Sequence, residues 1–219
     1  MKIAQSISAA LVLGAAFCVN AQAGDVGLVN HMSGDVSYSG QAGADSKAQA
    51  FMKVREGDRF TLSAGAQLRV VYFNGSRQET WKGPASFKAG TQQSESISGQ
   101  ATEAAQLPSG VGQKIAQLPN LIQIAKLGRS GGIAVRGGSK PARLSAENQA
   151  EVSQAKVAYA QMRQKSSPDD ITPELYFYSV LQDHLLYDEM KTVTDEMLKR
   201  QPSNPEVQDL AAYVKSRIL

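Results

Sequence analysis

Hydrophobic and polar residues alternate over the first part of the chain. Apolar residues recur at every second position between residues 66 and 73, the period of a strand that packs one face against a core; they are Ala66, Leu68, Val70 and Tyr72. Asn74-Gly75 then predicts a tight hairpin turn, because both residues tolerate positive φ, and residues 78–82 are expected to return as the partner strand. Shorter segments of the same kind cover residues 26–32, 36–39, 51–54, 59–62 and 86–88. About seven strands at this spacing predict a small antiparallel sandwich or barrel.

The last third of the chain has a helical period instead. Ser145 is the predicted N-cap of a first helix, while Thr172 as cap and Pro173 at the first helical position begin a second. Four amphipathic helices are expected, with apolar stripes at Val152, Ala155, Tyr159 and Met162; at Phe177, Val180, Leu181 and His184; at Tyr187, Met190, Val193 and Met197; and at Val207, Leu210, Ala211, Val214 and Ile218.

The segment between these parts combines helical spacing with a break. Apolar residues recur at helical spacing between positions 111 and 125, but Pro119 would clash with the carbonyl four residues earlier and so predicts two short helices. Net charge separates the same segments, at +1 for residues 24–100, +5 for residues 101–143 and −4 for residues 144–219. We therefore expect an α+β fold with a β domain over 24–100, a basic connecting segment over 101–143 and a helical domain over 144–219.

Residues 1–23 predict a cleavable signal peptide. Lys2 precedes an apolar run over residues 7–19, and Ala21-Gln22-Ala23 offers small residues to a signal peptidase, so cleavage is expected after Ala23. No later stretch approaches about twenty apolar residues, so the mature chain is expected to contain no transmembrane segment. Removal of Cys18 would leave no thiol for disulfides, metal binding or nucleophilic catalysis. These features indicate a bacterial periplasmic protein, with secretion as the alternative.

The β segment resembles the periplasmic FecR-type domain over about residues 25–90. The resemblance rests on a Ser-Gly-Asp-Val sequence at residues 33–36, on Gly57-Asp58 inside residues 54–60, and on the strand over residues 66–73 followed by Asn74-Gly75-Ser76. It implies a small antiparallel β domain, although a generic β-sandwich is the alternative. FecR regulators carry a sigma-factor-binding segment and a membrane helix before this domain, and here a predicted signal peptide takes that place. Direct regulation of a sigma factor is therefore not expected.

The helical segment resembles a divergent tetratricopeptide repeat. Residues 186–207 are similar to the second half of such a repeat and the start of the next, with Pro202 as its closing proline and Asn204-Pro205-Glu206 as the restart. Residues 171–185 would form the first helix, although Glu174 and Tyr178 replace the expected tryptophan and glycine. The resemblance implies a peptide-binding groove lined by Thr172, Leu175, Ser179 and Gln182. The alternatives are a generic helical bundle and a helical unit that serves only as packing against the β domain.

Catalytic, cofactor and metal sites are not expected from the residues. His31 lies in a predicted strand and His184 continues an apolar helical stripe, so both histidines are interpreted as structural. Asp169-Asp170 directly precedes a predicted helix, where carboxylates accept hydrogen bonds from free amides and interact with the helix dipole. The sequence thus predicts a non-enzymatic protein without a cofactor.

Function is expected to lie in binding. A formal net charge of +3 over 219 residues is too weak to indicate nucleic acid as the partner. We expect an exported cell-envelope protein that binds a protein partner through the FecR-like domain and the tetratricopeptide-like helices. The alternative is binding of an anionic cell-wall glycan through the basic segment, with Lys126, Arg129 and Arg136 as candidate contacts.

Overall fold

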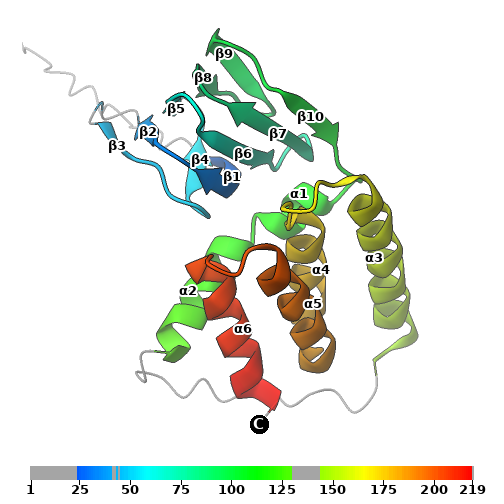
Figure 1. Ribbon diagram of the computed structural model, residues 1–219. Helices are drawn as coiled ribbons and strands as arrows, with labels where there is room; N and C mark the ends of the chain where they lie inside the picture. Colours follow the sequence, from blue (N-terminus) through cyan, green and yellow to red (C-terminus); the bar gives the residue numbers. More distant parts are fainter. Residues whose placement is uncertain (1–23, 41–42, 44, 130–143, 219) are drawn as a thin grey trace, which may run out of the picture.

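The computed structural model describes residues 24–40, 43, 45–129 and 144–218, which form a β-sandwich seated on a row of helices (Figure 1). The predicted signal peptide and its cleavage site after Ala23 lie outside the described residues. The α+β class and the antiparallel strand pairing are as expected from the sequence.

Two five-stranded antiparallel sheets make up the sandwich. In spatial order, the first sheet contains β10 (Glu103–Gln106), β7 (Arg77–Lys82), β6 (Gln67–Tyr72), β1 (Asp25–Ser33) and β4 (Lys53–Arg55). The second contains β3 (Asp45–Lys47), β2 (Val36–Ser39), β5 (Arg59–Leu62), β8 (Ala85–Ala89) and β9 (Ser94–Ser98). The sequence did not predict β3, β9 or β10.

Aromatic side chains fill the space between the two sheets. The ring of Phe87 on β8 stacks on Phe60 of β5 at a centroid distance of 5.2 Å and on Trp81 of β7 at 4.5 Å. All three side chains are buried. The inward-facing positions of the two sheets therefore interdigitate, as in other face-to-face sandwiches.

The β6–β7 hairpin has the predicted partner strands but a different turn. The ladder ends at the Tyr72–Arg77 pair, so residues 73–76 form a four-residue loop instead of a tight Asn-Gly turn. Ser76, with φ of 44°, is the residue in the left-handed region. Its Oγ accepts a hydrogen bond from the backbone N–H of Gly112 at 3.2 Å, and this contact ties the loop to the first helix. The prediction of the turn was wrong because a tertiary contact determines the loop.

The helices stand side by side beneath the first sheet (Figure 1). They are α1 (Val111–Ile115), α2 (Leu118–Arg129), α3 (Ala146–Lys165), α4 (Thr172–Asp183), α5 (Tyr187–Arg200) and α6 (Pro205–Ile218). Along the row, α3 packs on α4, α4 on α5 and α5 on α6, while α2 returns from earlier in the chain to pack on α6. The short helix α1 lies between α4 and β6. The four helices expected in the last third are thus confirmed.

Several of these helices begin at or near residues that the sequence marks as helix starts. Ser145 caps α3, where its side chain accepts a hydrogen bond from the N–H of Asn148 at 3.1 Å. Pro119 lies in the first turn of α2 and separates it from α1, as predicted. Thr172 is the first residue of α4 rather than its cap, because the carboxylate of Asp170 accepts its N–H at 2.9 Å.

A second apolar core joins the sandwich to the helices. Leu28 of β1 and Val71 of β6 face away from the sandwich interior and are fully buried against helical side chains, among them Ile115 of α1. Gly112 allows this close packing, since a Cβ atom there would lie 2.2 Å from the carbonyl oxygen of Phe73. The strand β6 is therefore covered on both faces. In addition, β10 extends the first sheet into the segment that charge had marked as a connector.

Within the described residues, no helix is both long enough and apolar enough to span a bilayer.

We predict that sandwich and helices unfold together. Trp81 is the single tryptophan and lies in the sandwich core, so its fluorescence reports on the sheets, while circular dichroism at helical wavelengths reports on the helices. Because Leu28 and Val71 belong to a core shared with the helices, the two signals should give one midpoint in urea. Two separated transitions would show instead that the halves are independent.

Candidate functional site

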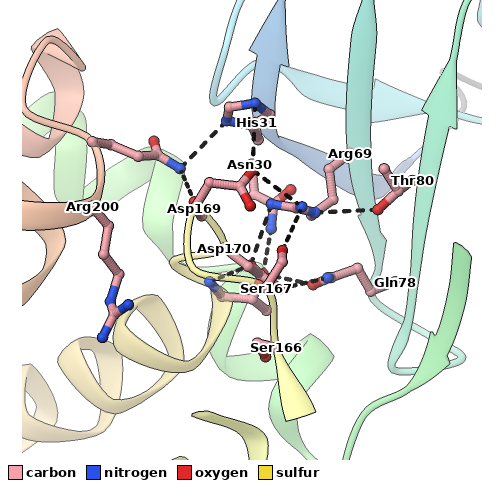
Figure 2. A network of polar contacts seen from close by, with 12 residues as sticks. Asn30, His31, Arg69, Gln78, Thr80, Ser166, Ser167, Asp169, Asp170 and Arg200 are labelled. Atoms are coloured by element: carbon pink, nitrogen blue, oxygen red, sulfur yellow. Dashed lines mark hydrogen bonds and ion pairs between the residues drawn. The ribbon is translucent and has the colours of Figure 1, made fainter. Parts of the chain in front are cut away.

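A buried arginine lies at the junction between the first sheet and the helices (Figure 2). Arg69 occupies the face of β6 that points toward the helices, and only 2% of it is exposed. Its Nε donates to the hydroxyl of Thr80 at 3.2 Å, and its Nη2 donates to Ser167 Oγ at 3.1 Å and Asp169 Oδ2 at 3.4 Å. Nη1 lies 3.7 Å from Asp170 Oδ1. The guanidinium is thus compensated by groups from a loop about one hundred residues later in the chain.

The carboxylate of Asp170 connects the same loop to two strands. One oxygen accepts from Gln78 Nε2 at 2.7 Å, and the other accepts from both the N–H and the hydroxyl of Thr172. The Thr172 hydroxyl also lies 2.6 Å from Gln78 Oε1 and accepts from the side-chain amide of Asn30. Asp170 therefore serves as a helix-start residue, as expected, and in addition as a link between the helices and the sheet.

His31 lies at the other end of this cluster. Its Nε2 is 3.8 Å from Asp169 Oδ2, and its Nδ1 is 3.4 Å from the side-chain amide of Gln201. That amide also donates to the backbone carbonyl of Asp169 at 2.8 Å. Burial and the nearby charge of Arg69 lower the pKa of His31 and outweigh the two carboxylates. Near pH 7 the imidazole is therefore neutral.

The pKa of Asp169 is lowered as well. Burial raises it, but the hydrogen bond from Ser167, the charge of Arg69 and the charge that His31 carries at the low pH where Asp169 titrates together outweigh that effect. Asp169 is therefore held ionised beside the Arg69 guanidinium.

Two further arginines hold the loop from the helical side. Arg163 on α3 donates to the backbone carbonyls of Ser166, Ser167 and Asp170 and forms a 3.1 Å ion pair with Glu174, which is fully buried. Arg200 on α5 donates to the carbonyl of Pro168 at 3.1 Å and pairs with the same glutamate at 3.3 Å. The loop over residues 166–170, which we call the junction loop, is thus fixed between the sheet and three helices.

We call the side chains that join the junction loop to the sheet the junction cluster: Asn30, His31, Arg69, Gln78, Thr80, Ser167, Asp169, Asp170, Thr172 and Gln201.

Two cavities border the junction loop. The first, of about 310 Å³, separates β10 from the end of α3 and is lined by Gln78, Glu103, Ala105, Gln106, Leu107, Pro108, Gln161, Met162, Lys165, Ser166, Ser167 and Asp170. The second, of about 340 Å³, lies next to the α5–α6 turn and is lined by His31, Met32, Ala50, Asp169, Arg200, Gln201, Pro202, Ser203, Asn204 and Pro205. Both are at the small end of the range for ligand pockets, roughly 300–1,000 Å³.

The peptide groove expected on α4 is not open. Thr172 belongs to the junction cluster and is 1% exposed, while Leu175 and Ser179 are fully buried. The Ser179 hydroxyl donates to the carbonyl of Leu175, and Gln182 is half-buried. The physical reason is that α1 packs on α4 under the sheet, so these side chains face the interior of the chain. Thr172, Leu175 and Ser179 therefore do not line an accessible surface.

The structure also locates the remaining candidates from the sequence. His184 at the end of α4 lies 3.1 Å from Glu151 of α3, and the two side chains link neighbouring helices. Lys114 pairs with Glu151 at 3.1 Å and with Asp183 at 2.6 Å, and Lys126 pairs with Glu206 at 3.2 Å.

Two of the three residues expected to contact a glycan cannot be located, because Arg136 and the Arg129 side chain lie outside the described residues. Within the described part of the chain, no three acidic, histidine or cysteine side chains form a group that could hold a metal ion.

Comparisons with protein-family models, with curated proteins and with solved structures found no match.

Replacing Arg69 with methionine should strongly destabilise the protein. The substitution leaves the buried Asp170 carboxylate without its cation, and breaking one partner of a buried pair costs about 3–5 kcal/mol. The control is Arg55→Met, which removes an exposed ion pair with Asp25 and should cost about 0–1 kcal/mol. Urea unfolding measures both. Equal losses for the two variants would contradict a special role for Arg69.

His31 should make stability depend on pH near neutrality. Its pKa is lower in the folded than in the unfolded protein, so the unfolded chain binds the proton first as the pH falls below about 6.5. The free energy of unfolding should therefore decrease as the pH falls below about 6.5, and His31→Asn should flatten this decrease. The control is His184→Asn, which measures how much the other histidine contributes to the pH dependence of stability. An unchanged pH slope in His31→Asn would contradict the assignment. Asp169 affects stability in a separate pH range. Because its pKa is lowered in the folded protein, its contribution to the free energy of unfolding is lost below about pH 4.

Proposed function

We propose that this protein is an exported, non-enzymatic binding protein of the bacterial cell envelope, which holds a protein partner on a rigid body made of sandwich and helices. The predicted signal peptide supports the location. The resemblances to a FecR-type domain and to a tetratricopeptide repeat support a binding role, since both are families of non-catalytic domains.

The junction cluster is the observation that carries this proposal. His31, Asp169 and Asp170 are the side chains at this site best suited to acid–base chemistry. Each contacts Arg69, another cluster member or the start of α4. Their arrangement is that of a structural joint, which fixes one layer of the protein on the other. A fixed arrangement of two surfaces favours binding, because it lowers the ordering cost of association.

The glycan alternative receives less support. Its motivation was the positive charge of residues 101–143, and the two lysines of this segment whose side chains the structure describes, Lys114 and Lys126, both pair with acidic side chains of the helical row. Paired lysines contribute less net field to a passing anion than free ones. We therefore favour a protein partner.

Photocrosslinking in living cells tests the proposal. A photoreactive amino acid is placed at one exposed position on each of four surfaces: Ile97 on β9, Ala104 on β10, Leu127 on α2 and Val157 on α3. At least one position should give a light-dependent adduct with an envelope protein, and the adduct should contain this chain beginning at Gly24. Absence of protein adducts at all four positions, together with sedimentation by purified peptidoglycan, would favour the glycan alternative.

A further inference from the structure

The sandwich has four edge strands, and β10 differs from the other three. Both β3 and β4 are three residues long, and β9 pairs with β8 through an irregular register between Ser86 and Phe87. By contrast, β10 pairs with β7 over four consecutive residues without a shift. Short or irregular edges discourage pairing with another chain, whereas a regular edge invites it.

The pairing of β10 leaves backbone groups directed outward. The N–H of Leu107 donates to the carbonyl of Ser76 at 2.8 Å, and alternation then directs the backbone groups of Ala105 toward β7 as well. The N–H and C=O groups of Ala104 and Gln106 consequently point away from the sheet. The Gln106 side chain does not cover them, because its amide donates to the carbonyls of Gly75 and Ser76. In the described part of the chain, β10 has no strand on its outer side.

The first cavity lies next to this edge and has an apolar wall. Ala105, Leu107, Pro108 and Met162 line it, with Met162 contributed by α3. In a strand paired with β10, every second side chain would point to the helical side of the sheet, where the cavity is. The cavity can therefore receive an apolar side chain of such a strand.

Charge favours an acidic neighbour for that side chain. Lys165, the last residue of α3, lines the cavity from the helical side, is exposed, and forms no ion pair with any described residue. The other cations nearby, Arg69 and Arg163, each pair with buried carboxylates, and the exposed carboxylate in the cavity lining, Glu103, belongs to β10 itself. A carboxylate on the bound strand would complement Lys165.

We propose that β10 and the adjoining cavity bind an extended segment of a partner protein, which adds to the first sheet as a further strand. The segment carries an apolar residue for the cavity and an acidic residue for Lys165. Main-chain hydrogen bonds to Ala104 and Gln106 supply affinity, and the cavity supplies specificity. This assignment rests on the proposed function and names the surface that performs it.

The test uses random linear peptides displayed on phage and selected on the purified protein. Individual enriched peptides are then synthesised and titrated by fluorescence anisotropy against three variants. Ala104→Pro removes the outward N–H without touching the pairing with β7 and should weaken binding at least about tenfold. Ala104→Ser retains the N–H and should bind as the unaltered protein does. Lys165→Glu should weaken binding and remove its salt dependence.

Hydrogen exchange supplies a second readout. A bound peptide should slow exchange of the amides of Ala104 and Gln106, while the amide of Ala105, which already faces β7, should change little. Unchanged urea midpoints in the three variants ensure that the effects on binding are not effects on folding.

Three results would overturn the proposal. The first is that no enriched peptide distinguishes Ala104→Pro from Ala104→Ser. The second is binding without protection of the Ala104 amide. The third is a dimer of this chain, detected by light scattering, that dissociates in Ala104→Pro, since the edge would then be occupied by a second copy. In each case crosslinks from Ile97, Leu127 or Val157 would still support a protein-binding function, so the two proposals fail separately.

Discussion

Burial of the Arg69 guanidinium is the constraint on which the arrangement of this protein depends. A charged group that is removed from water is tolerated only where opposite charges and acceptors surround it. Within its own sheet, Arg69 donates a hydrogen bond to the hydroxyl of Thr80 on the neighbouring strand β7. The remaining partners must come from another part of the chain, and the junction loop supplies them through Ser167, Asp169 and Asp170. The position of the loop on the sheet is thereby determined.

The same constraint orders the helices below the sheet. The junction loop connects α3 to α4, and Arg163 and Arg200 bind its carbonyl groups from the opposite side. Both also pair with Glu174, whose carboxylate is as deeply buried as Arg69. Cations and anions therefore alternate from the sheet through the loop into the helical row. Such a network ties its elements to one relative position, because a displaced member would leave a buried charge without a partner.

Local features of the fold could be predicted from the sequence, and long-range ones could not. Alternation between residues 66 and 73 identified β6, and Ser145 and Pro119 marked helix boundaries, because each signal acts within a few residues. The edge strands β9 and β10 were missed since their residues are mostly exposed and polar and carry no apolar period. The inner face of α4 was assigned to a groove because a helical stripe does not reveal whether another helix, here α1, covers it.

Only part of the candidate site could be predicted from the sequence, for a related reason. Asp169 and Asp170 were recognised as helix-start residues, and Asp170 does accept the N–H of Thr172. Their second role depends on Arg69, which lies far away in sequence and inside a strand. An arginine at a central position of an otherwise apolar segment was the available signal, because a charge there needs a buried acid elsewhere in the chain.

The junction also bears on what the open edge of the sheet can do. Three of the residues that line the cavity beside β10 belong to the junction cluster, namely Gln78, Ser167 and Asp170. Met162 and Lys165 belong to the last turn of α3, whose Arg163 binds the junction loop. The spacing between β10 and α3 is therefore set by buried charges and not by the flexible contacts of a surface groove. A segment that enters the cavity meets walls already in place, and less of its binding free energy is spent on ordering them. Loosening the Arg69 contacts would release the wall formed by α3 from the strand edge, so stability at the junction and affinity at the edge are physically linked.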